Sequence, residues 1–419
     1  MKLAYLKLLQ LLAKLQLAKN HPLIIGVTGS AGKSSAVAAI ALTLSNQFKV
    51  KATKKGNSET GLPMEILNIL VGNFALLDWL LLIPQAFWQL LTYWPNYEIL
   101  IAEVAIDSDL PPKNMDWQLS LIKPDIAVFL NANHVHLANF KNKTLAGIIS
   151  EKGKLVQAAQ KLAILNYDQT TIRNIKHIST AKKYFSLQEP TDIYLERQEA
   201  NLAGSQFIFN LHQQTYQINF KRQIIFPEFF GSLASAILIA DYLGLDINKS
   251  LINLANFRNL PGRGQVFVGI KDSILIDSSY NSSLEPTVAS LKLLKNIKHE
   301  GRKVAVLGDM RELGVATAED HRQLAKIANQ SAGLIITVGP ATEQYFPNNN
   351  RTHKFANAYQ ALEFLQNNIR QQDLILIKGS QNTIFLEIVV AGLLKNPADQ
   401  KYLCRRGKYW DKQRGKFSL

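Results

Sequence analysis

The feature that most constrains the fold is a short apolar strand followed by a glycine-rich turn and an alanine-rich helix. The strand is predicted over 23–28 and the helix over 34–44. Gly29 and Gly32 lie between them, where backbone N–H groups can converge on the oxygens of an anion. The helix directs its positive end at the same place. This arrangement predicts a phosphate-binding loop. The loop consists of Thr28, Gly29, Ser30, Ala31, Gly32, Lys33, Ser34 and Ser35.

Two side chains at the end of this loop indicate that it binds ATP with magnesium. Lys33 supplies positive charge to the β- and γ-phosphates, and the hydroxyl of Ser34 can reach a magnesium ion. Val27 stands where the strict eight-residue pattern has glycine, so the match is to a shorter form of the motif. A chance glycine-rich turn is the alternative, and the strand before it and the helix after it argue against that.

The rest of the chain alternates strand-like and helix-like segments, which predicts an α/β fold with a mainly parallel sheet. Polar and apolar residues alternate over 192–225, which predicts a small antiparallel insertion. A loop-like stretch at 260–264 suits a domain boundary. Beyond it, strand-like and helix-like segments alternate again, which predicts a Rossmann-like α/β domain. The predicted parts are a basic amphipathic helix (1–21), a central ATP-binding domain (22–260) and a C-terminal domain (261–419).

The composition limits the classes of partner. The 419 residues suffice for two or three domains. The formal net charge of +15 favours anionic partners, which are nucleotides, nucleic acid or an anionic membrane surface. No module that interleaves basic and aromatic residues is evident, so we expect no nucleic-acid binding. The single cysteine, Cys404, excludes an internal disulfide and fits the cytoplasm, and the basic tail over 401–416 is expected at the surface.

Two apolar segments raise the question of membrane contact. In 1–20, Lys7 and Lys14 interrupt the leucines one heptad apart, so this segment reads as a basic amphipathic helix. We expect it to pack on the next domain, and peripheral contact with a membrane is the alternative. In 74–94, Asp78 and Pro84 break a run that would otherwise be long enough to span. We predict an interfacial or partner-covered helical hairpin there.

Further motifs follow the loop in order. They are GNSETGLP at 56–63, IAEV at 101–104, NHVHLANF at 133–140 and EKGKL at 151–155. The loop and these motifs resemble those of the Mur ligases, which join an amino acid or peptide to a carboxylate through an acyl phosphate. The resemblance implies catalytic roles for Lys33, Glu103, His136 and Lys152.

The resemblance implies that Ser34, Glu103 and His136 organise Mg²⁺, and that Lys152 is modified to a carbamate that holds a second ion. The chemistry agrees, because magnesium screens the repulsion between a carboxylate and the γ-phosphate. Each residue also has a plainer interpretation. Glu103 would be a strand-end carboxylate, His136 a satisfied loop histidine and Lys152 a solvated helix residue.

Motifs in the C-terminal half resemble the branch of the family that adds D-alanyl-D-alanine to a muramoyl peptide in peptidoglycan synthesis. They are DSSYNSS at 277–283, GDMRELG at 308–314 with His321 downstream, and KGS at 378–380. Arg263 falls where the family places an arginine that contacts ATP phosphate, and Asp277 is expected to help orient the nucleotide. The partners implied are ATP, Mg²⁺, a muramoyl-peptide acceptor and D-alanyl-D-alanine.

Three departures from the family pattern leave alternatives open. Few residues precede the first strand, so we expect the usual UDP-gripping N-terminal domain to be absent. Residues 228–232 read EFFGS where the family has asparagines that contact adenine, and Ser278 replaces a second aspartate. One alternative is a ligase for another acid, as folylpolyglutamate synthase and cyanophycin synthetase are. The other is a degenerate nucleotide-binding scaffold subunit.

Overall fold

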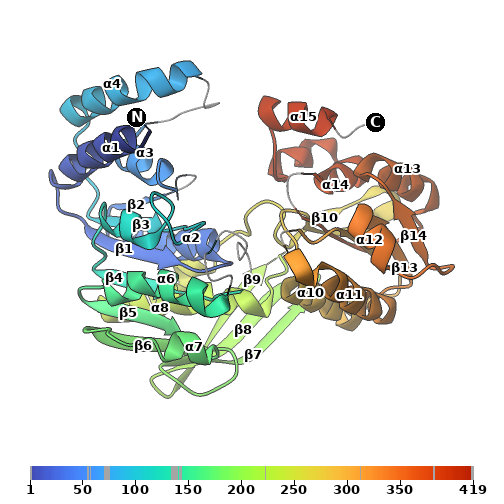
Figure 1. Cartoon of the computed structure of the whole chain (residues 1–419). Coiled ribbons are helices and arrows are strands. Elements are labelled where there is room, and N and C mark those ends of the chain that lie inside the picture. The colour runs from blue at the N-terminus through green and yellow to red at the C-terminus, as the bar shows by residue number, and fades with distance from the viewer. Residues whose placement is uncertain are drawn as a thin grey trace. The chain divides into compact units, whose positions relative to one another are not determined.

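The computed structural model describes residues 2–53, 56, 58–69, 76–133, 140, 144–221, 223–311, 313–380 and 383–416. The chain forms two internally packed units (Figure 1). The first comprises Met1–Arg197, Phe207–Ile218 and Pro227–Phe257. The second comprises Gln198–Gln206, Asn219–Phe226 and Arg258–Leu419.

The predicted strand before the glycine-rich turn is an interior strand of a nine-stranded sheet. Strand β1 (Leu23–Thr28) pairs in parallel with β3 (Ile99–Glu103) on one side and with β4 (Ile126–Phe129) on the other. The strand order is β2-β3-β1-β4-β5-β6-β7-β8-β9. The remaining strands are β2 (Val50–Ala52), β5 (Leu162–Asn166), β6 (Ala181–Ser186), β7 (Ile193–Asn201), β8 (Gly204–Leu211) and β9 (Gln214–Lys221). Because neighbouring parallel strands end at one edge, the residues that follow β1, β3 and β4 lie close together.

The predicted antiparallel insertion is confirmed in β7, β8 and β9. Two-residue links join these neighbouring strands, which only antiparallel pairing allows. In the second link, His212 and Gln213 have φ of 52° and 62°, as a hairpin turn that matches the strand twist requires. Burial alternates along β8, as the sequence pattern predicts for a strand with one covered face.

Helix α2 (Lys33–Leu44), which follows the glycine-rich turn, is held in place by α8 (Phe230–Tyr242) and α9 (Ile247–Leu254). Serine and alanine predominate where α2 and α8 meet, which allows the two backbones to approach closely. At Gly231 a Cβ atom would lie 2.9 Å from the ring of Phe185 on β6. Glycine is therefore required where α8 begins, beside the sheet that carries the turn.

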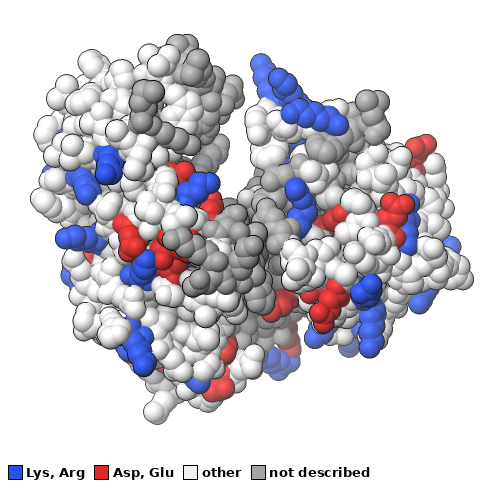
Figure 2. Space-filling view, viewed as in Figure 1, with Lys and Arg blue, Asp and Glu red and all other residues white. Residues whose placement is uncertain are grey.

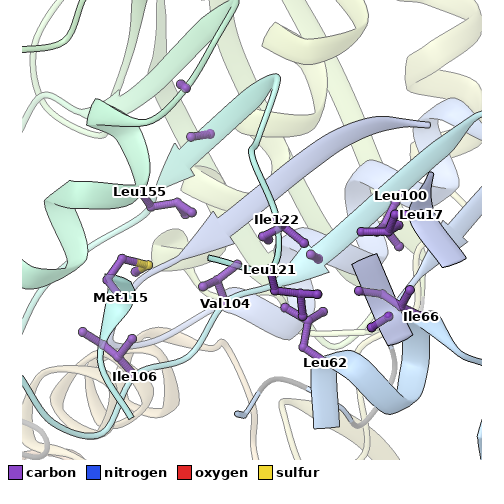
Figure 3. Packing of buried hydrophobic residues seen from close by; sticks show 14 of the residues in the cluster. Leu17, Leu62, Ile66, Leu100, Val104, Ile106, Met115, Leu121, Ile122 and Leu155 are labelled. Atoms are coloured by element: carbon purple, nitrogen blue, oxygen red, sulfur yellow. The ribbon is translucent and has the colours of Figure 1, made fainter. Parts of the chain in front are cut away.

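The N-terminal helix α1 (Lys2–Leu17) packs on the first unit, as expected. One side of it buries Leu9, Leu12 and Leu17 in the main core of this unit. Figure 3 shows Leu17 close to Leu100 of β3 within this core. Further contributors are α3 (Gly61–Ile66), α5 (Met115–Leu119), α6 (Leu145–Gln157) and α7 (Thr170–Arg173).

The apolar segment over 74–94 differs from the prediction. Its described residues form one helix, α4 (Leu76–Thr92), and not a hairpin. Pro84 lies inside this helix, and its exposed ring does not end it. The side chains of Leu82 and Ala86 are buried against the unit, and this packing on one side offsets the backbone hydrogen bond that proline removes. In the described part of the chain, no helix has the length and apolar character needed to cross a membrane.

The second unit is a doubly wound α/β domain, as predicted. Its strand order is β10-β11-β15-β12-β13-β14, in which only the β10–β11 pair is antiparallel. The strands are β10 (Gln265–Val268), β11 (Ile274–Ser278), β12 (Lys303–Gly308), β13 (Leu334–Val338), β14 (Thr352–Phe355) and β15 (Leu374–Lys378).

Two separate apolar clusters cover this second sheet, one involving α13 and α14 and the other α10 and α11. Burial on both faces explains why its strands read as continuous apolar runs in the sequence. The helices are α10 (Leu284–Asn296), α11 (Thr317–Ser331), α12 (Pro340–Tyr345), α13 (Ala358–Asn368), α14 (Glu387–Leu393) and α15 (Lys408–Gly415).

Candidate active site

The glycine-rich loop ends at an uncapped helix N-terminus. Gly32 precedes α2 with φ of 81°, a left-handed conformation that favours glycine, and it provides no side-chain cap. The first N–H groups of a helix have no acceptor within the helix. An anion at this position would satisfy them and would also meet the positive end of the helix dipole. The local geometry therefore fits the phosphate-binding role that the sequence predicts for the loop.

Asn131, which the sequence analysis did not single out, holds the loop in this shape. Its carbonyl oxygen accepts from the N–H of Ser30 at 2.9 Å, and its Oδ1 accepts from the N–H of Ala31 at 2.8 Å. Its Nδ2 donates to the carbonyl oxygen of Ala31 at 3.1 Å. Asn131 lies just beyond β4, next to β1 in the sheet. The sequence signal that could have identified Asn131 is its position as a polar residue at the end of a strand that neighbours β1.

Two lysines meet at the first glycine of the loop. Nζ of Lys33 donates to the carbonyl oxygen of Gly29 at 2.9 Å, and Nζ of Lys152 donates to the same oxygen at 3.3 Å. Lys152 comes from α6 and is only 4% exposed, so it is not a solvated helix residue. Burial, and then the charge of Lys33, lower the pKa of Lys152 to about 7. A substantial fraction of its amine is therefore neutral and nucleophilic near neutral pH.

Ser34 and Glu103 place two oxygen atoms beside this lysine pair. Oγ of Ser34 donates to Oε2 of Glu103 at 2.7 Å. The parallel register sets Glu103 opposite Val27, and the N–H of Glu103 donates to Oγ1 of Thr53 at 2.9 Å. Glu103 is 8% exposed. A carboxylate and a hydroxyl are the hard oxygen ligands that Mg²⁺ prefers, so this pair fits a magnesium site.

A second carboxylate, that of Asp107, also contributes to the charge around the site. Both Asp107 and Glu103 act electrostatically on Lys152, raising its pKa against the larger effect of burial. Asp107 follows β3 by a few residues, and it was not predicted. His136, the remaining predicted metal ligand, lies outside the described residues. Within the described ranges, no cluster of three or more His, Cys, Asp or Glu side chains could hold a metal ion.

The structure thus brings together Lys33, Ser34, Glu103 and Lys152 in the first unit, whereas Arg263 and Asp277 belong to the second. Asp277 is the penultimate residue of β11 and has no exposed surface. Its Oδ1 accepts from the N–H of Ser279 at 3.0 Å, and its Oδ2 has no hydrogen-bond partner among the described residues. Burial raises the pKa of Asp277 to about 6.

The loop after β11 rests on a buried arginine. Nη1 of Arg405 donates to the carbonyl oxygen of Ser279 at 3.3 Å, and Nη2 donates to that of Tyr280. The same Nη1 lies 2.8 Å from Oε2 of Glu387. Arg263 stacks on the ring of Tyr280, 4.6 Å from its centroid. The expectation that the basic tail is surface is therefore wrong for Arg405, which is buried because it supplies hydrogen bonds to a strand-end loop.

Two other residues from the C-terminal motifs are engaged within the second unit. Asp309 accepts from the N–H groups of Ala341 and Thr342, at 3.1 and 2.7 Å, where α12 begins. Buried His321 accepts at Nε2 from the N–H of Met310 at 3.1 Å, and its Nδ1 lies 2.7 Å from the carbonyl oxygen of Thr317. These contacts position the loop that follows β12. Its residue Glu312 lies outside the described residues.

Two family domains match this chain. The Mur ligase middle domain matches residues 89–225, and the glutamate ligase domain of Mur ligases matches residues 262–381. The UDP-N-acetylmuramoyl-tripeptide--D-alanyl-D-alanine ligase of Buchnera aphidicola subsp. Baizongia pistaciae is 24% identical over 386 residues, which are 90% of this chain and 76% of that protein. The ligase of the same name from Synechocystis sp. is 27% identical and covers 89% of this chain and 75% of its own length.

The fold is also that of a solved structure, MurF ligase from Thermotoga maritima in complex with ADP. The TM-score is 0.77 at 22% sequence identity, with 92% of this chain and 83% of that chain covered. At this level of identity the likeness establishes the arrangement of strands and helices. It agrees with the predicted α/β architecture of an ATP-binding domain followed by a second α/β domain.

Proposed function

The chain belongs to the Mur ligase family, and we propose that it is an ATP-dependent, ADP-forming ligase that adds D-alanyl-D-alanine to a muramoyl peptide in peptidoglycan synthesis. The observation that carries this proposal is the cluster of Lys33, Ser34, Glu103 and Lys152 around the phosphate-binding loop. Relatives named as this ligase, which span most of the chain, support the choice of substrates.

The reaction has two steps. A carboxylate oxygen of the acceptor attacks the γ-phosphorus of ATP, forming an acyl phosphate as the bond to ADP breaks. The amine of the dipeptide then attacks the acyl carbon, the C–N bond forms, and inorganic phosphate leaves with loss of a proton from the amine. Lys33 and the N–H groups at the start of α2 hold the phosphates in line and offset the charge that develops during transfer.

We propose that Ser34, Glu103 and His136 hold Mg²⁺, which screens the repulsion between the acceptor carboxylate and the γ-phosphate. Lys152 contributes a different chemistry. Its neutral amine is the form that adds to carbon dioxide, and the resulting carbamate anion would place a negative charge where an ammonium now meets Gly29. Activity should then fall in buffer depleted of carbon dioxide and return on addition of bicarbonate. A Lys152→Arg enzyme should show no such recovery.

In the second unit, Arg263 and the loop over 278–281 are proposed to orient the nucleotide. Asp277 lies beneath this loop and acts through the N–H of Ser279, because its carboxylate has no exposed surface. The central and C-terminal domains are proposed to cover residues 22–260 and 261–419.

Phosphate release from ATP and Mg²⁺ tests the function. It is measured with UDP-MurNAc-tripeptide in the presence and absence of D-alanyl-D-alanine, and mass spectrometry identifies the product. Release that requires both substrates, together with an acceptor that gains the dipeptide, is the expected result. Lys33→Ala should abolish it, while Lys249→Ala, at an exposed lysine of α9, should retain it. ATP binding without release from any of these mixtures would contradict the proposed substrates and favour another acid acceptor or a scaffold role.

A further inference from the structure

Two packed helices of the first unit expose an unusual amount of apolar surface. Leu80, Trp88, Leu91 and Trp94 are 65%, 66%, 72% and 71% exposed. We call this surface the α1–α4 face. It consists of Leu3, Leu8, Leu11 and Leu15 on α1, and of Leu80, Leu81, Phe87, Trp88, Leu91 and Trp94 on and just after α4. Such a concentration on one small region marks an interaction surface, whereas single exposed apolar residues are normal.

The exposure does not result from poor packing of these helices. On α1, Leu6, Leu9 and Leu12 are buried, so this helix is anchored by its opposite side. Further contacts fix α1 against its neighbours, because Nε2 of Gln10 donates to the carbonyl oxygen of Trp117 at 2.9 Å and Nε2 of Gln16 to that of Tyr93 at 2.8 Å. Both helices are therefore apolar on two sides, and the described residues cover only one of these sides.

The charges on the α1–α4 face are positive. Exposed Lys7 and Lys14 lie among the leucines of α1, which contains no acidic residue, and Nζ of Lys19 lies 4.5 Å from the centre of the Trp94 ring. The only acidic residue of α4 is Asp78, in its first turn. Figure 2 shows the surface over α4 as nearly free of charge, with basic side chains over α1.

A groove beside α1 is lined by both lysines. It has a volume of about 490 Å³, and Lys7, Lys14, Leu11 and Trp117 contribute to its wall. Asp116 also borders it, but the carboxylate of Asp116 is paired with Lys154, Nζ to Oδ2 at 2.6 Å. Anionic groups at the edge of the α1–α4 face would therefore meet the ammonium groups of Lys7 and Lys14 beside apolar side chains.

We propose that the α1–α4 face binds peripherally to the surface of an anionic phospholipid bilayer. The tryptophans and leucines enter the boundary between headgroups and acyl chains, while Lys7 and Lys14 lie at the lipid phosphates. Helices that lie in the interface, with lysines beside leucine and tryptophan, bind in this way. A second copy of this chain fits less well, because a twofold contact would bring the lysines of one face toward those of the other. The proposal does not depend on the ligase activity.

Flotation of the full chain with vesicles tests the proposal. At low salt we expect the protein to float with vesicles that contain phosphatidylglycerol and to remain behind with pure phosphatidylcholine, and salt should reverse the binding. Lys7→Gln with Lys14→Gln should weaken partitioning roughly thirtyfold, since each basic residue near such a surface contributes about fivefold. Trp88→Gln with Leu91→Gln should weaken it roughly tenfold or more.

Matched variants elsewhere on the surface provide the controls. Lys292→Gln with Lys326→Gln removes two exposed lysines of the second unit, and Ile252→Gln with Val268→Gln removes two exposed apolar side chains. Both should bind vesicles as the unchanged protein does. Thermal melting confirms that each variant is folded. In addition, brominated lipids should quench the tryptophan fluorescence of the unchanged protein. This quenching should be weakest in the double variant Trp88→Phe with Trp94→Phe.

Three results would overturn the proposal. The first is the absence of flotation with anionic vesicles at low salt. The second is an equal loss of binding in the control variants. The third is a dimer in sedimentation experiments that Trp88→Gln with Leu91→Gln dissociates, without any binding to vesicles, since this would assign the α1–α4 face to a second copy of the chain.

Discussion

Lys33 and Lys152 donate to one backbone oxygen, the carbonyl of Gly29, although 118 positions of the sequence separate them. Each lysine thus places a positive charge beside the other, and one of them is almost completely buried. Two cations converging on the phosphate-binding loop create a position where an anion is strongly favoured. The same arrangement lowers the proton affinity of the buried lysine.

The pKa of Lys152 makes stability depend on pH. Burial and Lys33 lower the pKa of Lys152 to about 7, whereas an unfolded lysine has a pKa near 10.4. Between these values the unfolded state binds more protons, so the free energy of unfolding should rise with pH. The test is urea unfolding in carbon dioxide-free buffer at pH 8 to 10. The free energy of unfolding of the unchanged protein should rise with pH more steeply than that of Lys152→Met, by up to about 1.4 kcal/mol per pH unit. Lys249→Met should match the unchanged protein, and equal slopes for Lys152→Met would contradict the shift.

Ser34→Ala should raise the magnesium requirement. The variant loses the hydroxyl that donates to Oε2 of Glu103 and that is proposed to bind the ion. The lost hydrogen bond costs about 1 kcal/mol of stability, so the variant should fold. Phosphate release titrated with Mg²⁺ should shift to higher concentrations, roughly tenfold. Ser45→Ala, at an exposed serine after α2, provides the control. An unchanged titration would remove Ser34 from the proposed ligands.

Asn131→Ala should weaken ATP binding. It removes the two side-chain hydrogen bonds to Ala31 that shape the loop, each worth about 1 kcal/mol. Calorimetry with a non-hydrolysable ATP analogue should show a Kd roughly tenfold higher or more. The control is Asn253→Ala, because Asn253 pairs with Asn46 at the surface. Equal affinities for the Ala variant and the unchanged protein would show that the loop holds its shape without Asn131.

Asp277→Asn should reduce the pH dependence of stability in acid. Burial raises the pKa of Asp277 to about 6, above the value near 3.9 of an unfolded aspartate. The folded state therefore holds this proton more tightly, and the free energy of unfolding should fall as pH rises from about 4 to about 6. Asparagine retains the acceptor for the N–H of Ser279 and carries no charge, so this contribution should disappear. Denaturant unfolding at pH 4, 5 and 6 measures it, with Glu319→Gln as an exposed control.

Arg405→Lys should destabilise the second unit although the charge is kept. One guanidinium binds Glu387 and the carbonyl oxygens of Ser279 and Tyr280, and an ammonium group cannot reach all of them. The expected loss is about 2 kcal/mol in urea unfolding. The neighbouring exposed residue offers a close control, so Arg406→Lys should change stability by less than about 0.5 kcal/mol. Similar losses in both variants would show that the bridging contacts of Arg405 are not needed.

Local patterns were sufficient for much of the fold. Strand β1, the turn and α2 were predicted to within a residue, because an apolar run, two glycines and an alanine-rich stretch are adjacent in the sequence. Four strands of the second sheet, β11, β12, β13 and β15, were predicted for a similar reason, since burial on both faces leaves short apolar runs. The edge strands β10 and β14 were not predicted. The segment over 74–94 was predicted wrongly as a hairpin. Pro84 indicated a break in the helix, but packing of Leu82 and Ala86 against the unit keeps the helix continuous.

By itself the sequence determined the phosphate-binding loop, the α/β class and the family, since these depend on residue types at short, ordered spacings. Only the tertiary structure decided that Lys152 is buried beside Lys33, that Asn131 holds the loop and that Arg405 lies beneath the loop after β11. These facts depend on which strands are neighbours and on which helix covers them. Burial then changes the chemistry of a side chain, because a charge removed from water is stabilised only by the groups that the fold places around it.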